Sequence, residues 1–413
     1  MLEENTEVGI TPKDWATSDE IIKVVGVGGG GCNAVSYMYE QGIKGCSFVV
    51  CNTDAQAIQC SPVPVKIQMG AGLGAGTNPI RGRNAALDSQ DTIERVILTP
   101  ATEMLFITAG MGGGTGTGAA PVIAKMAKDK GVLTVGVVTL PFKSDGNEAI
   151  SRAIDGIHEL EKNVDSLLII NNEKLHEFYG DLLMHDAFPK ADEVLATAVR
   201  GILEIIKTPG VINVDFEDVK SMMKDSGMAL MGYGTGSGKD RIAQAVDQAF
   251  NSPLLNDFDL KSARNVLVNI TGGRNEHGLT MNDKNEINRR IEEYTGGANK
   301  FKSGLVLSDD PATGDTIHIT AIVTGLKLTD VLGRNRDMGN YIMIDRNFVY
   351  DDSGDDVIAF PPDAENTGHI GFNTQENTRI FHFADDQKPV LMVGSMESRA
   401  ELEDIPAIRR SKK

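Results

Sequence analysis

The sequence predicts an α/β protein with a mostly parallel, doubly wound sheet, a long central helix, a smaller α+β second domain and a disordered tail. Three observations lead to this prediction. Apolar runs bounded by glycine alternate with helical segments between residues 21 and 170, the pattern of buried parallel strands joined by crossover helices. A long amphipathic segment follows. After residue 210 the order of strands and helices changes.

The strands expected in the first domain, residues 19–186, are short apolar runs. They cover residues 21–27, 47–51, 103–110, 133–138 and 166–170, and helices are expected at residues 33–39, at 85–97 and around Pro121. Residues 1–18 should form an extended tail. Because strand, crossover helix and parallel strand recur, helices are expected on both faces of the sheet.

A single long helix is expected at residues 187–207, within a central segment that ends at residue 210. Its apolar positions are Val194, Val199, Ile202 and Ile205. At 1.5 Å per residue it would span about 30 Å, the width of a small domain. Pro209-Gly210 should end it.

The second domain, residues 211–325, is expected to be α+β. Strands are expected at 228–232 and 265–270, helices at 240–250 and 285–294, and a closing hairpin from 304–307 and 316–323. Residues 326–400 should be a disordered acidic linker, because their apolar clusters are too sparse to fill a core. Residues 401–413 form a distinct terminal segment.

Composition excludes several classes of function. The formal net charge is -18, which argues against broad nucleic-acid binding and against adsorption to an anionic membrane. No apolar run approaches the ~20 residues of a membrane span, and the acidic N-terminus is unlike a signal peptide. Four cysteines without CxxC spacing indicate reduced thiols of a cytosolic protein, and the scattered histidines make a structural metal site improbable.

Three glycine-rich turns carry the strongest functional signal. Gly112–Gly118 lies between a predicted strand and a predicted helix, the arrangement in which main-chain N–H groups cradle phosphate. Gly26–Gly31 matches GxGxxG, and with Asp54 it would suggest a dinucleotide site. Gly70–Gly76 also follows an expected strand. In chain order, Gly26–Gly31, Gly70–Gly76 and Gly112–Gly118 are the first, second and third glycine turns. Three such turns suit one nucleotide with a long polyphosphate tail, and the alternative is three unrelated tight turns.

Gly234–Lys239 resembles a Walker A motif but differs from it at two positions. Tyr233 stands where the first glycine of that motif belongs, and Asp240 replaces the hydroxyl residue that binds magnesium. We therefore expect a simple turn into the helix that begins at Asp240.

The loop Asn213–Asp218 contributes an amide and two aspartates at the start of the second domain. Asp215 or Asp218 could simply cap the next helix. Alternatively, these groups could polarise a water molecule or bind a cation. No histidine or serine base accompanies them, so covalent catalysis has no support.

These motifs together resemble the tubulin/FtsZ family, in particular its bacterial cell-division members. The glycine signature of that family corresponds to Gly112–Gly118, and the resemblance extends from about Ile21 to Gly325. Gly26–Gly31, Gly72–Gly76 and Asn213–Asp218 fall in the family's order, as do Asn52–Gln56 and Val268–Gly273.

The resemblance implies a GTP-binding protein that assembles head to tail and hydrolyses GTP between subunits. The residues it assigns to the nucleotide are Gly29, Gly30, Gly31, Cys32, Asn33, Gly72, Gly74, Ala75, Gly76, Gly114, Thr115, Gly116, Phe142 and Asp145, with Phe188 stacking on guanine and Asp192 accepting from its amide edge. Asp215 and Asp218, with Asn213, would serve the nucleotide of a neighbouring subunit. Mg²⁺ should bridge the terminal phosphates.

Two departures from the family pattern affect the phosphate site. Asp145 is a shorter acid than usual, the arginine position is Ala149, and Arg152 follows one helical turn later. The loop before Gly72 is about four residues shorter than in typical family members, which also bears on turnover.

The resemblance also implies partners and a location. Asp404–Arg410 resembles the family's docking peptide, so division proteins that tether the polymer to the membrane are expected to bind it, without direct membrane contact. The expected location is the cytoplasm at mid-cell. The alternatives are an NAD-dependent oxidoreductase, or a GTP-binding filament with little hydrolysis.

Overall fold

The computed structural model describes residues 20–173, 184–208, 210–251, 260–310 and 313–326, with five short strands between residues 341 and 382. The side chains of residues 184–189 and 191 lie outside this description. The chain divides into two compact units, Met1–Val331 and Leu332–Lys413. The predicted N-terminal tail, most of the linker and the docking peptide fall outside the described residues.

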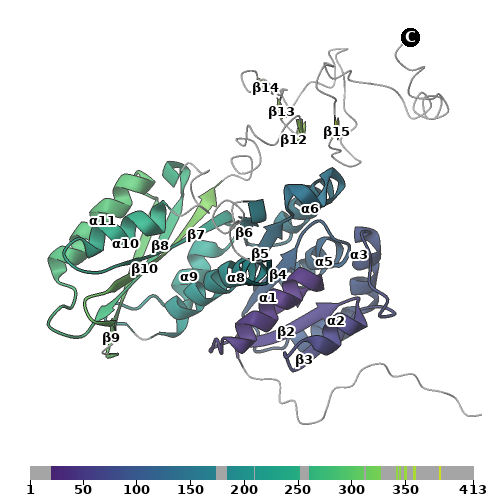
Figure 1. Ribbon diagram of the computed structural model, residues 1–413, viewed down its shortest axis with the longest axis horizontal. Coiled ribbons are helices and arrows are strands. Elements are labelled where there is room, and N and C mark those ends of the chain that lie inside the picture. Colours follow the sequence, from purple (N-terminus) through teal and green to yellow (C-terminus); the bar gives the residue numbers. More distant parts are fainter. Residues whose placement is uncertain are drawn as a thin grey trace, which may run out of the picture. The chain divides into compact units, whose positions relative to one another are not determined.

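The first unit is built on one ten-stranded sheet with the order β3-β2-β1-β4-β5-β6-β7-β10-β8-β9 (Figure 1). The strands are β1 (Ile22–Val27), β2 (Ser47–Asn52), β3 (Val65–Gln68), β4 (Met104–Gly110), β5 (Leu133–Leu140), β6 (Ser166–Asn171), β7 (Gly227–Gly236), β8 (Asn265–Gly273), β9 (Lys300–Ser308) and β10 (Ile317–Leu326). The pairs from β3 to β6 are all parallel, which confirms the doubly wound prediction.

Helices cover both faces of this sheet. They are α1 (Gly28–Glu40), α2 (Ala55–Cys60), α3 (Pro79–Asp88), α4 (Gln90–Ile97), α5 (Thr115–Asp129), α6 (Asn147–Glu161), α8 (Met184–Lys207), α9 (Phe216–Met223), α10 (Arg241–Phe250) and α11 (Met281–Thr295). Helix α1 packs on α8, whereas α3 and α6 pack on α5. Alternate strand residues such as Val24, Phe106 and Val135 join α1 and α8 in one buried cluster, as the period of two in a strand requires.

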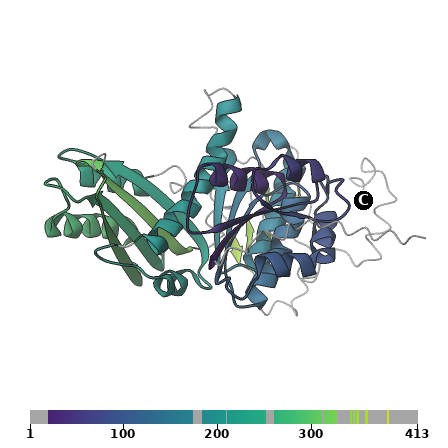
Figure 2. The ribbon, with the colours of Figure 1, turned by 90° about the horizontal axis from the view of Figure 1, so that it is seen from below.

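Helix α8 joins the two lobes of the sheet. It lies between the N-terminal lobe, purple to blue, and the green lobe built on β7–β10 (Figure 2). Its buried residues, including Val199 and Leu203, share a core with Met231 of β7, Leu267 of β8 and Ile322 of β10. By contrast, β6 and β7 pair through only three residues each. The hydrophobic contact through α8 therefore adds to this short strand pairing in holding the lobes together.

The length of α8 connects opposite edges of the parallel sheet. Near its start it borders Ile170, at the carboxyl end of β6. At its end, Lys207 Nζ lies 3.1 Å from the carboxylate of Glu20, which precedes β1. With 24 residues the helix is about 36 Å long. Whatever follows α8 therefore begins at the amino edge of β1.

Two local predictions were wrong. The expected hairpin of β9 and β10 does not form, because β10 inserts between β7 and β8 while β9 pairs parallel with β8 at the sheet edge. Burial explains the order: β10 is almost wholly buried, whereas β9 begins with three exposed residues. The single helix expected at 85–97 is two helices, broken at Ser89.

In the second unit the structure describes five short strands that we did not predict. They are β11 (Tyr341–Ile342), β12 (Ile344–Asp345), β13 (Phe348–Tyr350), β14 (Val357–Ala359) and β15 (Phe381–His382). Strands β12–β14 form one small sheet, and β11 pairs with β15. Two of the apolar clusters judged too sparse for a core, at 348–350 and 381–383, include strand residues.

Candidate functional site

The three glycine-rich turns meet at the carboxyl edge of the parallel sheet. The N–H of Gly114 donates to Gly76 O at 2.9 Å, which joins the third turn to the second. The hydroxyls of Thr53 and Thr115 lie 2.6 Å apart, and Thr53 O accepts from the N–H of Gly74 at 2.9 Å. A β-carbon on Gly28 would lie 2.8 Å from Gly116 N. The three turns therefore form one continuous surface of main chain, which we call the glycine surface.

The glycines of this surface fall into two kinds. At Gly31 and Gly114 a β-carbon would lie 2.1 Å from Thr108 O and 2.4 Å from Gly76 O, so glycine is required there for packing. At Gly29 and Gly113 a β-carbon would meet nothing within 4 Å. Both of these residues are exposed. They border open space, where a ligand could approach the backbone closely.

Two helices begin at this surface without a side-chain cap. Helix α1 has Val27 and α5 has Gly114 at the N-cap position, and neither makes a side-chain cap hydrogen bond. The first N–H groups of both helices therefore lack the usual partner, and both positive dipole ends meet here. An anion with several oxygens, such as a polyphosphate, fits this set of donors.

The other predicted residues of the first two turns have different surroundings. The Cys32 thiol is 3% exposed and points to Gly26 O at 3.6 Å, and burial raises the pKa of this thiol to about 12. Only its main chain is available to a ligand. Asn33 is exposed and Ala75 is buried, while Gly72 O accepts from Ala55 N at 3.0 Å.

Asp54, the candidate ribose ligand of a dinucleotide site, has a structural role. Its Oδ1 accepts from the N–H groups of Gln56 at 2.9 Å and Ala57 at 3.3 Å. Asp54 is thus the N-cap of α2. This capping role explains why an aspartate occupies the position, and no ligand is needed to explain it.

Phe142 and Asp145 form the tight turn after β5. Asp145 Oδ2 accepts from the N–H of Phe142 at 2.9 Å, and the N–H of Asp145 donates back to Phe142 O at 3.0 Å. This turn leads into α6, where the carbonyl of Ala149 would lie 2.9 Å from a β-carbon on Gly112. The turn therefore adjoins the third glycine turn.

Asp192 lies near the start of α8. Its helical neighbours Ala196 and Val199 belong to the buried cluster that α8 shares with α1. Burial raises the pKa of the Asp192 carboxyl to about 6, and its carboxylate has no ion pair among the residues that the structure describes. Phe188 falls one turn earlier in α8, but its side chain is outside the description.

The loop Asn213–Asp218, which we call the acidic loop, lies at the amino edge of the parallel sheet, opposite the glycine turns. Asp215 is the N-cap of α9, and its Oδ1 accepts from the N–H of Asp218 at 2.7 Å. Asp218 Oδ1 lies 2.7 Å from Nζ of Lys302 on β9. Asn213 Oδ1 accepts from the N–H of Gly210 at 2.6 Å. The capping role considered from the sequence is therefore real, yet the carboxylate of Asp215 is exposed.

Two main-chain hydrogen bonds, one before and one after α9, hold the acidic loop in place at the amino edge. The N–H of Val211 donates to Leu305 O at 2.7 Å, and after α9 the N–H of Ser226 donates to Asp165 O, just before β6, at 2.9 Å. Strand β1 has six residues, so about 20 Å of sheet separates this edge from the glycine turns. Within one chain, the aspartates and the glycine surface do not form a single site.

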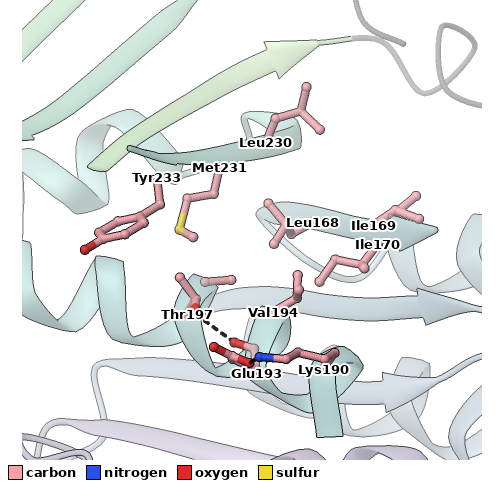
Figure 3. Close-up of a pocket in the computed structure, with 11 residues that line it drawn as sticks. Leu168, Ile169, Ile170, Lys190, Glu193, Val194, Thr197, Leu230, Met231 and Tyr233 are labelled. Atoms are coloured by element: carbon pink, nitrogen blue, oxygen red, sulfur yellow. Dashed lines mark hydrogen bonds and ion pairs between the residues drawn. The ribbon is translucent and has the colours of Figure 1, made fainter. Parts of the chain in front are cut away.

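A cavity between β6, α8 and β7 escaped the sequence analysis. Its volume is about 220 Å³, and Ile170, Val194, Thr197, Met231 and Tyr233 are among its lining residues (Figure 3). Lys190 and Glu193 pair at 2.6 Å on the same face of α8. On the helix, this face is opposite Asp192. The spacing 190, 193, 194 and 197 marks this face in the sequence.

No group of three or more histidine, cysteine, aspartate or glutamate side chains is arranged to hold a metal ion in the described segments. Among the helices that the structure describes, none is both long and apolar enough to cross a bilayer.

Comparisons with known proteins agree with this arrangement. Residues 21–180 match the model of the GTPase domain of the tubulin/FtsZ family, and residues 227–327 match that of the C-terminal domain of the FtsZ family. The chain is 48% identical over 318 residues to the cell division protein FtsZ of Pseudomonas putida, covering 76% of this chain and 78% of that protein. It is 45% identical over 312 residues to the cell division protein FtsZ of Porphyromonas gingivalis, covering 75% and 67% of the two chains.

Solved structures give the same result. The FtsZ dimer of M. jannaschii superimposes with a TM-score of 0.66 at 39% identity, covering 74% of this chain and 88% of that one. CetZ2 of Haloferax volcanii, at 20% identity and a TM-score of 0.63 over 74% of this chain and 93% of that one, shares the fold. These matches exclude the dinucleotide oxidoreductase, and they establish that the chain belongs to the tubulin/FtsZ family of GTPases.

Proposed function

We propose that each subunit supplies half of the GTPase site, and that stacking two subunits head to tail completes it. The glycine surface of one subunit holds GTP. The acidic loop of the next subunit brings Asp215 and Asp218 to the terminal phosphate. The observation that carries this proposal is the placement of these two features at opposite edges of one sheet, joined by the length of α8.

Exposed apolar side chains at both edges support head-to-tail contact. Leu73 and Ile80 adjoin the glycine turns and are 93% and 68% exposed. At the other edge, Val211 and Phe301 flank the acidic loop and are 62% and 39% exposed. A contact between two different surfaces does not close on itself, so it propagates a filament.

We assign the nucleotide groups from this surface. The N–H groups of Gly29, Gly30, Thr115 and Gly116 lie in the first turns of α1 and α5 and would hold the phosphates. The other predicted residues would line the nucleotide, and they are Gly31, Asn33, the Gly72–Gly76 turn and Gly114. Asp192 would accept from the guanine amide edge, with Phe188 beside it. Magnesium would be held largely by phosphate oxygens and water, its usual ligands in nucleotide sites, and when bound it neutralises charge on the terminal phosphates.

The acidic loop would act on water. An exposed carboxylate at Asp215 can accept a hydrogen bond from the attacking water and orient it toward the γ-phosphate. Asp218 is held by Lys302, so the face offered to an anionic nucleotide carries less negative charge. Asn213 would help to fix the loop through its bond to Gly210.

The direct test is GTP turnover per subunit as a function of protein concentration. A shared site predicts that turnover is very low in dilute monomer and rises as subunits assemble. Turnover per subunit that does not change with concentration would contradict the proposal. Filaments that persist undiminished when GTP is supplied in a limited amount would favour the alternative of an assembly with little hydrolysis.

We further propose that the polymer scaffolds the division ring in the cytoplasm at mid-cell, and that Asp404–Arg410 binds membrane-tethering division proteins. The peptide is amphipathic in sequence and follows an acidic linker, which suits folding onto a partner. Deletion of residues 401–413 should leave polymerisation unchanged and abolish partner binding in a pull-down with the tether. Loss of polymerisation in the truncated chain would contradict this assignment.

A further inference from the structure

One face of α6 supports the third glycine turn. Ala149, Arg152 and Gly156 share this face, since residues three and four apart in a helix are neighbours. A β-carbon on Gly156 would lie 2.3 Å from Thr117 Cγ2, and Ala149 O lies close to Gly112. Small residues on either side of Arg152 thus bring α6 close to the first turn of α5.

Both main-chain polar groups of Gly112 form hydrogen bonds with side chains. Its N–H donates to Thr117 Oγ1 at 2.9 Å, and its carbonyl accepts from Arg152 Nε at 2.9 Å. Gly112 has φ +102°, a conformation that only glycine adopts without strain. A glycine–glycine peptide has little intrinsic preference for one orientation, so the bond from Arg152 to the carbonyl decides the orientation of the Gly112–Gly113 peptide.

The bond from Arg152 fixes the direction of the next N–H group. Gly112 C=O and Gly113 N–H belong to one trans peptide unit, in which the carbonyl and the N–H point in opposite directions. Since the carbonyl points to α6, the N–H of Gly113 points away from it. Gly113 is exposed, and the space around its β-carbon position is open. No hydrogen bond from this N–H is present within the described chain.

We propose that Arg152 is a positioning residue for phosphate binding: it locks the Gly112–Gly113 peptide so that Gly113 N–H donates to the phosphates of the nucleotide. This inference rests on the proposed nucleotide site. Arg152 also places a permanent positive charge beside that site. Its side chain is 23% exposed, and Nη1 lies 3.4 Å from Glu148, whose side chain is 94% exposed.

The test compares four variants in titrations of GDP and GTP at protein concentrations below assembly. R152M removes the donor and the charge but keeps the aliphatic stem, R152K restores a cationic donor, and R152Q keeps a neutral one. E148Q is the matched control, because it breaks the surface ion pair and leaves the bond to Gly112 in place.

R152M should bind both nucleotides about tenfold more weakly, the range of one charge-assisted hydrogen bond. R152K should stay within about threefold of the original protein and E148Q within about twofold, with R152Q between R152K and R152M. In assembled protein, R152M should raise KM for GTP with little change in kcat, because the lost interaction is made in ground state and transition state alike.

A positioning role also predicts a local change in the free protein. Amide hydrogen exchange of a peptide spanning residues 110–117 should be faster in R152M, with the melting temperature nearly unchanged. Binding by R152M equal to the original protein overturns the inference, as does an equal loss in E148Q. Failure of every form to bind nucleotide would instead contradict the proposed site itself.

Discussion

Asp218 Oδ1 lies 2.7 Å from Nζ of Lys302, so the acidic loop carries its own counter-charge. The hydrogen bond to Asp218 raises the pKa of the Lys302 ammonium, which stays charged at neutral pH. In the proposed filament, this pair lies on the surface that faces the polyphosphate bound to the neighbouring subunit. Lys302 therefore reduces the repulsion between two negatively charged partners.

Removal of Lys302 should weaken assembly. We expect K302M to raise the critical concentration about twofold to fivefold at low salt, and less at high salt, because the interaction is screened. Light scattering measures this directly. K300M is the matched control, since Lys300 lies on the same strand and its ammonium donates to Ser221 O at 3.4 Å. Identical behaviour of the two variants would mean that the Asp218 pair has no role in assembly.

Asp215 combines a cap with a proposed catalytic role, and two substitutions separate them. Asparagine caps helices as well as aspartate does, whereas alanine does not. D215N should therefore keep the melting temperature and GTP binding, while turnover falls at least about a hundredfold. D215A should show the same loss of turnover and an additional destabilisation of about 1 kcal/mol. Normal turnover in D215N would leave Asp215 with its capping role alone.

The two kinds of glycine in the first turn predict opposite outcomes. In G29A the new methyl group meets no protein atom within 4 Å, so stability of the free protein should be unchanged while nucleotide affinity falls about tenfold or more. In G31A the methyl group would clash with Thr108 O, and overpacking should destabilise the protein by about 1–3 kcal/mol. Calorimetry and nucleotide titration distinguish the two. Full nucleotide affinity in G29A would place the ligand elsewhere.

Asp192 should give nucleotide binding a dependence on pH. Burial raises the pKa of its carboxyl to about 6, and in the proposed site the guanine edge would bind the ionised form. Affinity is therefore full above this pKa and falls as the pH drops through it, by roughly fourfold between about pH 7.5 and pH 5.5.

D192N should bind guanine nucleotides more weakly at neutral pH and lose this dependence. E204Q is the control, because Glu204 lies on the same helix and its pKa is also raised by burial, yet it is at the far end of α8 from the guanine contact. Fluorescence titration over this range measures both variants. An unchanged pH profile in D192N would remove Asp192 from the guanine site.

The parts of the fold that follow from local sequence were predictable. Apolar runs such as β1 and β5 are buried along their whole length, so composition alone identifies them as central parallel strands. The glycine turns at Gly26–Gly31 and Gly112–Gly118 were predictable for the same reason, because each follows or ends such a strand. The turn at Gly70–Gly76 follows β3, an edge strand that is only partly buried. Pro209-Gly210 correctly marked the end of α8.

What depended on distant contacts was not predictable. β9 and β10 are consecutive in the chain, and only the different burial of their side chains places β10 inside the sheet. The break at Ser89 and the early start of α1 at Gly28 are likewise decided by packing. The contact of Arg152 with Gly112 needed α6 to approach α5, which the small residue Gly156 permits.

A complementation assay tests the shared site most directly. One partner is D215N, with an intact glycine surface and a defective acidic loop. The other is G29V, with an intact loop and a side chain in the nucleotide space. Neither should turn over GTP alone, and pelleting of the mixture confirms that they assemble together. In an equimolar mixture, roughly a quarter of the junctions join an intact surface to an intact loop. If each junction forms one shared site, turnover should reappear at up to about that fraction of the original rate; mixed polymers with no turnover would contradict the shared site.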